Sequence, residues 1–174
     1  MKVLGIVGSL RKDSYNRSLM NAFVTQKPEG VEMEIADIAT LPFYDQDLES
    51  NFPESALALK AQIENADAII IATPEYNRSI PGVLKNAIDW LSRPYGKNSF
   101  SGKKVLVVGA SVGPTGAAMG QYDLKKMLLH GNAHVLGQPE FFVGSVRNKF
   151  DEQGTLTDEE TKKYIDGAWA RITE

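Results

Sequence analysis

Short apolar runs alternate with longer amphipathic stretches along this chain. Val3–Val7, Ala68–Ala72 and Val105–Gly109 are almost wholly apolar, as expected of parallel strands that are covered on both faces. Glu32–Ile35 and His134–Leu136 are weaker strand candidates. The pattern therefore predicts five strands.

Apolar residues at helical spacing fill the intervals between these runs. The expected helices are Ser18–Val24, Glu54–Asn65, Pro81–Leu91, the segment around Leu124–Leu128, and Thr161–Ile172 with Asp158 or Thr157 as N-cap. Strands that alternate with helices imply right-handed βαβ crossovers. We therefore expect an α/β fold with a doubly wound, five-stranded parallel sheet and helices on both faces.

Composition narrows the classes of function. The 174 residues suit one domain, residues 1–174, with no second domain. A net charge of −3 argues against general nucleic-acid binding. The chain has no cysteine and two histidines, which excludes thiolate chemistry and argues against a metal site. No signal peptide or membrane-length apolar stretch is evident, so we expect a cytoplasmic protein with no membrane partner.

The loops after the first, third and fourth predicted strands should carry the chemistry, because ligands of such sheets bind at the carboxyl ends of the strands. The first loop, residues 8–18, contains Ser9, Arg11, Ser14, Asn16 and Ser18. Hydroxyl and amide groups, an arginine and a helix start together favour a phosphate cradle. The alternative is a polar loop that merely caps a helix.

The other two loops are suited to a flat ring. Residues 73–82 contain two prolines that stiffen the backbone, with Tyr76 for apolar contact. Residues 110–116 are small, so a ring can approach the main chain closely. A structured turn before a helix explains the second loop equally well, and glycine-rich loops like the third are common.

Four ordered motifs in residues 3–145 resemble the NADPH-dependent FMN reductase family, whose members include chromate reductases, quinone reductases and azoreductases. They are Gly8-Ser9-Leu10-Arg11 with Ser14 and Asn16, then Leu41-Pro42-x-Tyr44-Asp45, then Thr73-Pro74-Glu75-Tyr76-Asn77 followed by Pro81-Gly82-x-Leu84-Lys85-Asn86-Ala87-Ile88-Asp89-Trp90, and Gln138-Pro139-Glu140-Phe141. The resemblance implies a flavodoxin-like fold, FMN as cofactor and NAD(P)H as co-substrate.

The resemblance also implies roles for individual residues. Ser9, Arg11 and Asn16, with Ser18 as a weaker candidate, would hold the FMN phosphate. The isoalloxazine would lie against Pro74, Glu75, Tyr76 and Asn77 on one side and Ser111 and Gly113 on the other. It further implies a homodimer or homotetramer in which loops of one subunit border the flavin of another, with Phe43 and Tyr44 as the expected border.

Arg78 departs from the family pattern, because many relatives carry a smaller or aromatic residue there. It is a candidate for a phosphate of the nicotinamide nucleotide, or it lies in solvent. His130, His134, Trp90 and Trp169 are more simply explained as capping or core residues than as catalytic groups.

The resemblance implies an enzyme that passes hydride from NAD(P)H to FMN and then two electrons to a quinone or similar acceptor, such as chromate, an azo compound or free flavin. We expect a ping-pong mechanism. The flavin would be the reactive centre, and no catalytic side chain is expected. A one-electron flavodoxin-like carrier is the alternative. A phosphoacceptor receiver domain is disfavoured, because Gly8 and Thr73 stand where it needs acidic residues.

Overall fold

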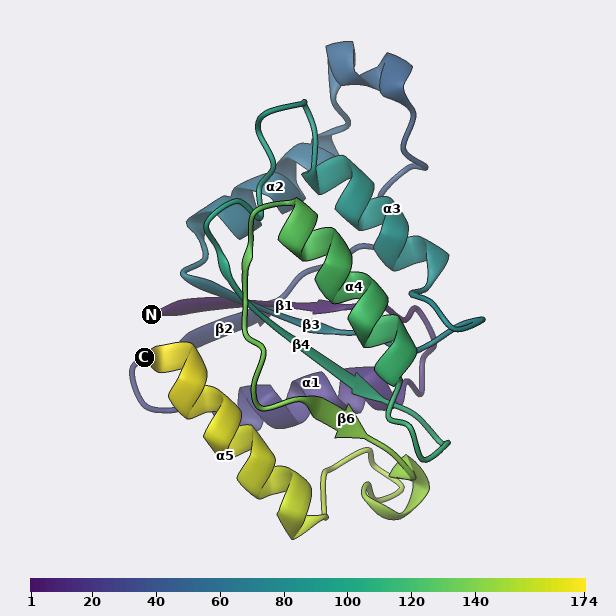
Figure 1. Cartoon of the computed structure of the whole chain (residues 1–174), viewed down its shortest axis with the longest axis vertical. Coiled ribbons are helices and arrows are strands. Elements are labelled where there is room, and N and C mark those ends of the chain that lie inside the picture. Colours follow the sequence, from purple (N-terminus) through teal and green to yellow (C-terminus); the bar gives the residue numbers. More distant parts are fainter.

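A parallel sheet forms the centre of the computed structural model, which describes all 174 residues (Figure 1). Its strands are β1 (Lys2–Val7), β2 (Glu32–Ile35), β3 (Ala68–Ala72), β4 (Lys104–Ala110), β5 (His134–Val135) and β6 (Phe141–Val143). They lie in the order β2-β1-β3-β4-β5, and β6 also pairs with β4. All pairings are parallel, and the α/β doubly wound fold is confirmed.

The fifth position of the sheet is divided. β5 pairs with the start of β4 at Lys104 and Val105, whereas β6 pairs with its end, from Val108 to Ala110. Between them the chain passes through Gly137-Gln138-Pro139, and proline has no N–H group to donate to the sheet. The five predicted positions are therefore present, and β6 was missed by the sequence prediction.

Five α-helices cover the two faces of this sheet. They are α1 (Tyr15–Thr25), α2 (Glu54–Asn65), α3 (Gly82–Leu91), α4 (Ala118–His130) and α5 (Glu159–Thr173). The segment around Leu124–Leu128, predicted as a helix, lies within α4. The other four predicted helices are also confirmed, with shifted ends for all but α2.

Local capping explains two of these shifted starts. Helix α1 begins three residues before the prediction because the Ser14 side chain caps its first turn. Helix α5 begins at Glu159 because Asp158 is its N-cap.

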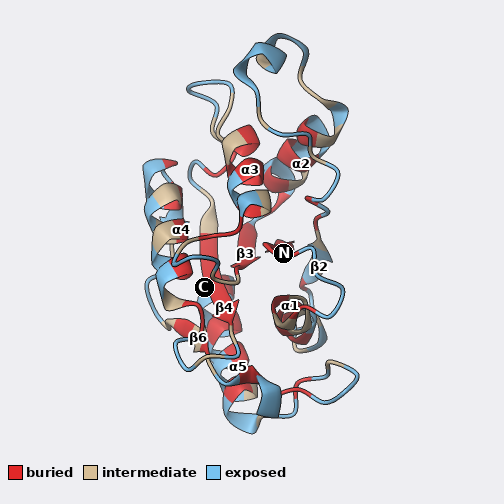
Figure 2. Ribbon diagram, turned by 90° about the vertical axis from the view of Figure 1, so that its right-hand side faces the viewer, coloured by how far each residue is buried: buried red, intermediate tan, exposed pale blue.

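Two apolar cores result, one on each side of the sheet (Figure 2). One lies between the sheet and the pair α1 and α5, and it contains Phe23 and Trp169. The other lies under α2, α3 and α4. Trp90 and Trp169 are fully buried, so both tryptophans are packing residues as predicted. None of the helices combines the length and the apolar composition that a membrane-spanning segment requires.

The parallel arrangement brings the carboxyl ends of β1, β3 and β4 to one edge of the sheet, at the right of Figure 1. Val7 is paired with Ala72, and Ala72 with Val108. Two main-chain bonds continue the ladder past the strands: Gly8 N–H donates to Ala72, and Thr73 N–H donates to Val108. The loops that follow these strands therefore start side by side.

Asp158 gives a stability prediction. Ion pairing with Lys149 and a hydrogen bond from Thr161 lower the pKa of Asp158 to about 2. We expect Asp158→Ala to lower the free energy of unfolding by about 1 kcal/mol at neutral pH, the usual worth of an N-cap. Because the folded-state pKa is depressed, this contribution is present above about pH 4 and is lost as the pH falls toward 2.

Urea unfolding of both proteins between pH 7 and pH 3 measures this difference. The gap between wild type and Asp158→Ala should narrow below about pH 4. A gap of constant size over the whole range would contradict the assignment.

Candidate functional site

A cavity of about 140 Å³ lies where the loops after β1, β3 and β4 meet. All three loops that the sequence singled out contribute to its wall. The lining residues are Ser9, Arg11, Ser14, Tyr15, Asn16, Pro74, Glu75, Tyr76, Ala110, Ser111 and Val112. The carboxyl edge of the sheet therefore carries a site of the predicted composition.

The first loop ends at the start of α1, where main-chain donors are free. Ser14 caps the helix by accepting from Arg17 N–H at 3.4 Å. The N–H groups of Ser9, Tyr15 and Asn16 have no acceptor within the chain. Such a group of unpaired N–H donors at a helix N-terminus is a ready site for an anion.

Arg11 lies at the rim of this group of donors. Its guanidinium folds back on its own loop, with Nε donating to the carbonyl oxygen of Asp13 at 3.1 Å, and it stands 5.9 Å from the centre of the Tyr15 ring. Arg11 is exposed, and it has no carboxylate partner. It is therefore the one cation in the wall of the cavity that can turn toward an anion without breaking an ion pair.

The Asn16 side chain is engaged with the sheet. Its Nδ2 donates to the carbonyl oxygen of Ala110 at 3.0 Å, and its Oδ1 accepts from Ala110 N–H at 2.9 Å. The residue is 3% exposed. The amide thus continues the hydrogen bonding of β4 and ties α1 to it, so that only the main-chain N–H of Asn16 is free for a ligand.

The second loop is a tight hairpin. Tyr76 and Ser79 exchange two main-chain hydrogen bonds, of 2.9 and 3.0 Å, around Asn77 and Arg78. Both central residues have positive φ, 53° and 66°, which is the pattern of a type I′ turn. Before the hairpin, the Glu75 carboxylate turns away to the start of α4, while the Glu75 N–H has no acceptor in the chain.

The third loop is fixed by the strand beside it. Ser111 N–H donates to Val143, and Ser145 N–H donates to Gly113, each at 3.0 Å. Gly116 has φ of +57°, and a Cβ there would lie 2.4 Å from the main chain of Phe142. Only glycine fits this contact, so the loop has little freedom to move.

Several predicted residues lie outside the cavity wall. Ser18 faces the segment around Gly154, where an added Cβ would lie 2.9 Å from its hydroxyl oxygen. Asn77 and Arg78 form the hairpin tip, and Gly113 lies behind Ser111. Tyr15, Ala110 and Val112 line the cavity although no ligand role was expected for them, and all three lie within the loops of residues 8–18 and 110–116.

Tyr44 belongs to a separate network on the outer side of α3. Its hydroxyl donates to Glu49 at 2.5 Å, and Glu49 also pairs with Arg93. Hydrogen bonds from Arg93 and Tyr44 hold the pKa of Glu49 below its usual range. The Tyr44 ring packs edge-on against Trp90, whereas neighbouring Phe43 is 88% exposed.

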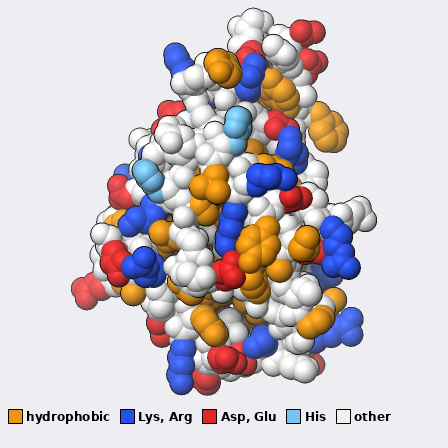
Figure 3. All heavy atoms as spheres, viewed as in Figure 1, with side chains coloured by type: hydrophobic (Ala, Val, Ile, Leu, Met, Phe, Trp, Pro, Cys, Tyr) orange, Lys and Arg blue, Asp and Glu red, His pale blue; other side chains and the backbone are white.

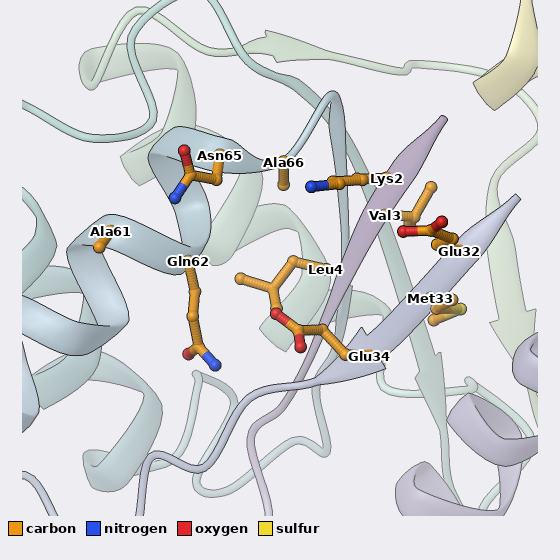
Figure 4. Close-up of a pocket in the computed structure, with 10 residues that line it drawn as sticks. All are labelled: Lys2, Val3, Leu4, Glu32, Met33, Glu34, Ala61, Gln62, Asn65 and Ala66. Atoms are coloured by element: carbon orange, nitrogen blue, oxygen red, sulfur yellow. The ribbon is translucent and has the colours of Figure 1, made fainter.

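A larger cavity, about 530 Å³, lies elsewhere, at the opposite edge of the sheet (Figure 4). It is a groove between α2 and the strands β1 and β2, where Gln62 stands near Leu4 and Glu34 (Figure 4). It lies at the amino ends of the strands, and no helix N-terminus opens into it. We therefore place the functional site in the smaller cavity.

The composition of the smaller cavity suits a phosphorylated flat ring. Free N–H donors and an unpaired arginine gather at the start of α1. Across from them, Pro74, Tyr76 and Val112 offer apolar surface, and the N–H groups of Glu75 and Val112 have no acceptor in the chain. These residues fit FMN, which has one terminal phosphate and a flat ring with a polar edge.

Comparison with known proteins agrees with this assignment. The family described as NADPH-dependent FMN reductase matches residues 1–148. A 2-hydroxy-1,4-benzoquinone reductase from a Burkholderia species is 41% identical, over 98% of this chain and 97% of its own. An NAD(P)H-dependent FMN reductase from Pseudomonas aeruginosa is 45% identical, over 95% of this chain and 89% of its own.

A solved structure shows the same arrangement of the chain. FerB, a flavoenzyme NAD(P)H:(acceptor) oxidoreductase from Paracoccus denitrificans, superimposes with a TM-score of 0.91 and 43% sequence identity. The match covers 98% of this chain and 94% of FerB. The flavodoxin-like fold is therefore confirmed.

Asn16 provides a test of how the site is held together. We expect Asn16→Ala to lower the free energy of unfolding by about 2–3 kcal/mol, because the buried N–H and C=O of Ala110 would both lose their partner. Urea denaturation measures this effect, and Asn21→Ala on the exposed side of α1 is the control. Equal stability of the two variants would show that the Asn16 pairing is dispensable.

Proposed function

Because this chain belongs to the NADPH-dependent FMN reductase family, we propose that the three-loop cavity binds FMN and uses it to reduce quinones or similar acceptors with NAD(P)H. The chain is an oxidoreductase of the FMN-dependent NAD(P)H quinone or FMN reductase type. Bound FMN would supply the chemistry, since it accepts hydride and passes on electrons. The protein would bind the FMN, orient it and limit access to it.

The observation that carries this proposal is the group of free donors at the start of α1. The N–H groups of Ser9, Tyr15 and Asn16 and the Arg11 guanidinium would hold the FMN phosphate. We keep Ser9, Arg11 and Asn16 as phosphate residues, with Asn16 acting through its main chain. Ser18 faces away from the cavity and is not proposed.

The second and third loops would hold the ring. Pro74 and Tyr76 would border one side and Ser111 the other, with the free N–H groups of Glu75 and Val112 at the polar edge. Asn77 and Gly113 adjoin these residues outside the cavity wall and would contact only a part of the ring that extends beyond it. Donors placed there would stabilise negative charge on the reduced ring.

Exposed apolar side chains surround the cavity and favour flat, apolar acceptors. Leu10, Tyr76, Val112 and Met119 come from the three loops and the start of α4, and each is more than half exposed. Figure 3 shows that hydrophobic side chains also gather over the lower half of the face that carries α4 and β6. This apolar surface supports quinones as acceptors more than highly charged substrates.

The cavity wall offers no free carboxylate, imidazole or thiolate that could act as a base. The lining holds no histidine or cysteine, and the carboxylate of Glu75 is engaged with main-chain N–H groups. The cavity is small, and no second lobe of the chain folds over it. We therefore infer that nicotinamide and acceptor use one place in turn.

The kinetic consequence is a ping-pong pattern. Initial rates over a grid of NAD(P)H and quinone concentrations should give parallel double-reciprocal lines. Several quinones should react, since stacking and apolar contact discriminate by only about 1–3 kcal/mol per small group. Lines that intersect would indicate a ternary complex and would rule out a shared place.

Arg78 is the residue best placed to meet a phosphate of the nicotinamide nucleotide. It occupies the second central position of the type I′ turn, where glycine is favoured and a side chain costs about 1 kcal/mol. Its side chain is 78% exposed, with a single weak contact to Glu75 at 3.5 Å. Glycine would make the turn more stable at this position, so the presence of an arginine points to a role in binding.

Arg78→Gly should therefore raise the KM for NAD(P)H about ten-fold while leaving the melting temperature unchanged or higher. The steady-state KM and a thermal melt of the same preparation measure both effects. Arg171→Ala, which removes an arginine from another i,i+3 ion pair at the end of α5, is the matched control. An unchanged KM would make Arg78 a solvent-exposed charge only.

We also infer that the whole chain, residues 1–174, is one FMN-binding domain that forms a homodimer or homotetramer. Helix α5, beyond the family match, buries Trp169 in the core beside Phe23, which supports one domain.

Phe43 projects from a segment that is anchored through Tyr44, Glu49 and Arg93. A rigidly held, exposed aromatic side chain suits contact with a second copy. Sedimentation of a monomer at micromolar concentration would overturn the inference.

A further inference from the structure

Helix α4 lacks a cap of its own. The residue before it, Ala117, has a left-handed backbone with φ of 61° and no side-chain group to offer. The first N–H groups of a helix need acceptors from elsewhere. The N–H of Ala118 bonds to the carbonyl oxygen of Thr115 in the preceding loop. The next two N–H groups find their acceptor in another loop: Glu75 Oε2 accepts from Met119 N–H at 3.0 Å and from Gly120 N–H at 3.3 Å.

This contact crosses from the ring-binding loop to the helix. Glu75 follows β3, and its partners lie 44 and 45 residues later in the chain. The Glu75 side chain is only 12% exposed. A carboxylate at a helix N-terminus is also favoured by the helix dipole. The cap is therefore a tertiary link with little access to water.

Two further contacts hold the same loop to α4. Gly120 touches it closely, since an added Cβ would lie 3.1 Å from the carbonyl oxygen of Ser79 and 3.3 Å from that of Pro74. One turn later, a hydrogen bond from Lys126 and the proximity of the Ser79 hydroxyl keep the pKa of the Asp123 carboxyl below its usual range. Residues 74–79 are thus fixed at both ends.

We propose that Glu75 is a positioning residue, whose carboxylate caps α4 and thereby holds the Pro74–Ser79 loop in the conformation that receives the flavin ring. This rests on the proposed function for the identity of the ligand. The role differs from the one that the family resemblance implied, since the Glu75 carboxylate serves the helix and only its main chain faces the ring.

The cap would act on FMN binding through the populations of the loop's conformations. Without the cap, the loop gains other conformations, and the apparent dissociation constant for FMN rises in inverse proportion to the fraction that remains in the competent one. The free energy that an N-cap usually contributes corresponds to roughly a five- to ten-fold change in the dissociation constant. A glutamine at position 75 has the same length and keeps an oxygen that can accept the two N–H groups.

The experiment compares three variants of the whole chain. Fluorescence titration of the apo-protein should give an FMN dissociation constant about ten-fold higher for Glu75→Ala and within about three-fold of wild type for Glu75→Gln. Asp158→Ala is the matched control, because it removes the N-cap of α5 away from the cavity. It should lose stability while binding FMN as wild type does.

Amide exchange gives a readout that needs no cofactor. In the apo-protein, the N–H groups of Met119 and Gly120 should lose protection in Glu75→Ala and keep it in Glu75→Gln. Loss of this protection with unchanged FMN binding in Glu75→Ala would overturn the positioning role. Equal loss of FMN binding in both Glu75 variants, with protection kept in Glu75→Gln, would also overturn it, because the charge itself would then contact the ligand.

These outcomes are separate from failure of the proposed function. If the wild-type protein takes up no FMN, the assignment of the cavity is wrong. The exchange data would then still report whether Glu75 caps α4.

Discussion

The site depends on the parallel register of β1, β3 and β4. Val7, Ala72 and Val108 lie in one row, where β1 and β3 end, and β4 ends just beyond it at Ala110. The three loops therefore leave the same edge of the sheet. Each loop is then tied to a neighbour. Asn16 bonds to the end of β4, Glu75 bonds to the start of α4, and Ser111 bonds to Val143 at the end of β6. The donors that remain unpaired are therefore held in place before any ligand arrives.

This arrangement supplies the groups that would bind and orient the proposed cofactor, which would carry the chemistry. The functional groups in the wall are main-chain N–H groups, one arginine and apolar surface. Such groups bind and orient a cofactor, and orientation alone is worth several kcal/mol of barrier. The relatives that carry the same fold at high identity are named as reductases of FMN, quinones or other acceptors, which disfavours the one-electron carrier.

Much of the fold could be predicted from the sequence, because buried parallel strands can be recognised as runs of apolar residues. Ala68–Ala72 was predicted to the residue, and the alternation of elements gave the doubly wound sheet. The short strand β6 was missed, since Phe141–Val143 comes soon after a proline, and proline is typical of a loop. The position of the site was also predictable, because it follows from topology.

Which side chains of the site bond to main-chain groups elsewhere in the chain was not predictable. Asn16 and Glu75 have polar side chains in the expected loops, yet both bond to main-chain groups far along the chain. Main-chain partners leave no signature in the identity of the residues that offer them. The resemblance implied that Phe43 and Tyr44 border a partner's flavin. The sequence did not indicate that the Tyr44 hydroxyl bonds to Glu49 and its ring packs on Trp90, while Phe43 is exposed.

The central claim is that the loop before α1 recognises a terminal phosphate. The most direct measurement is a comparison of FMN with riboflavin, which has the same ring and no phosphate, by titration of the apo-protein. If the free N–H groups of Ser9, Tyr15 and Asn16 hold a phosphate, FMN should bind at least about a hundred-fold more tightly. Equal affinity for the two flavins would contradict the account.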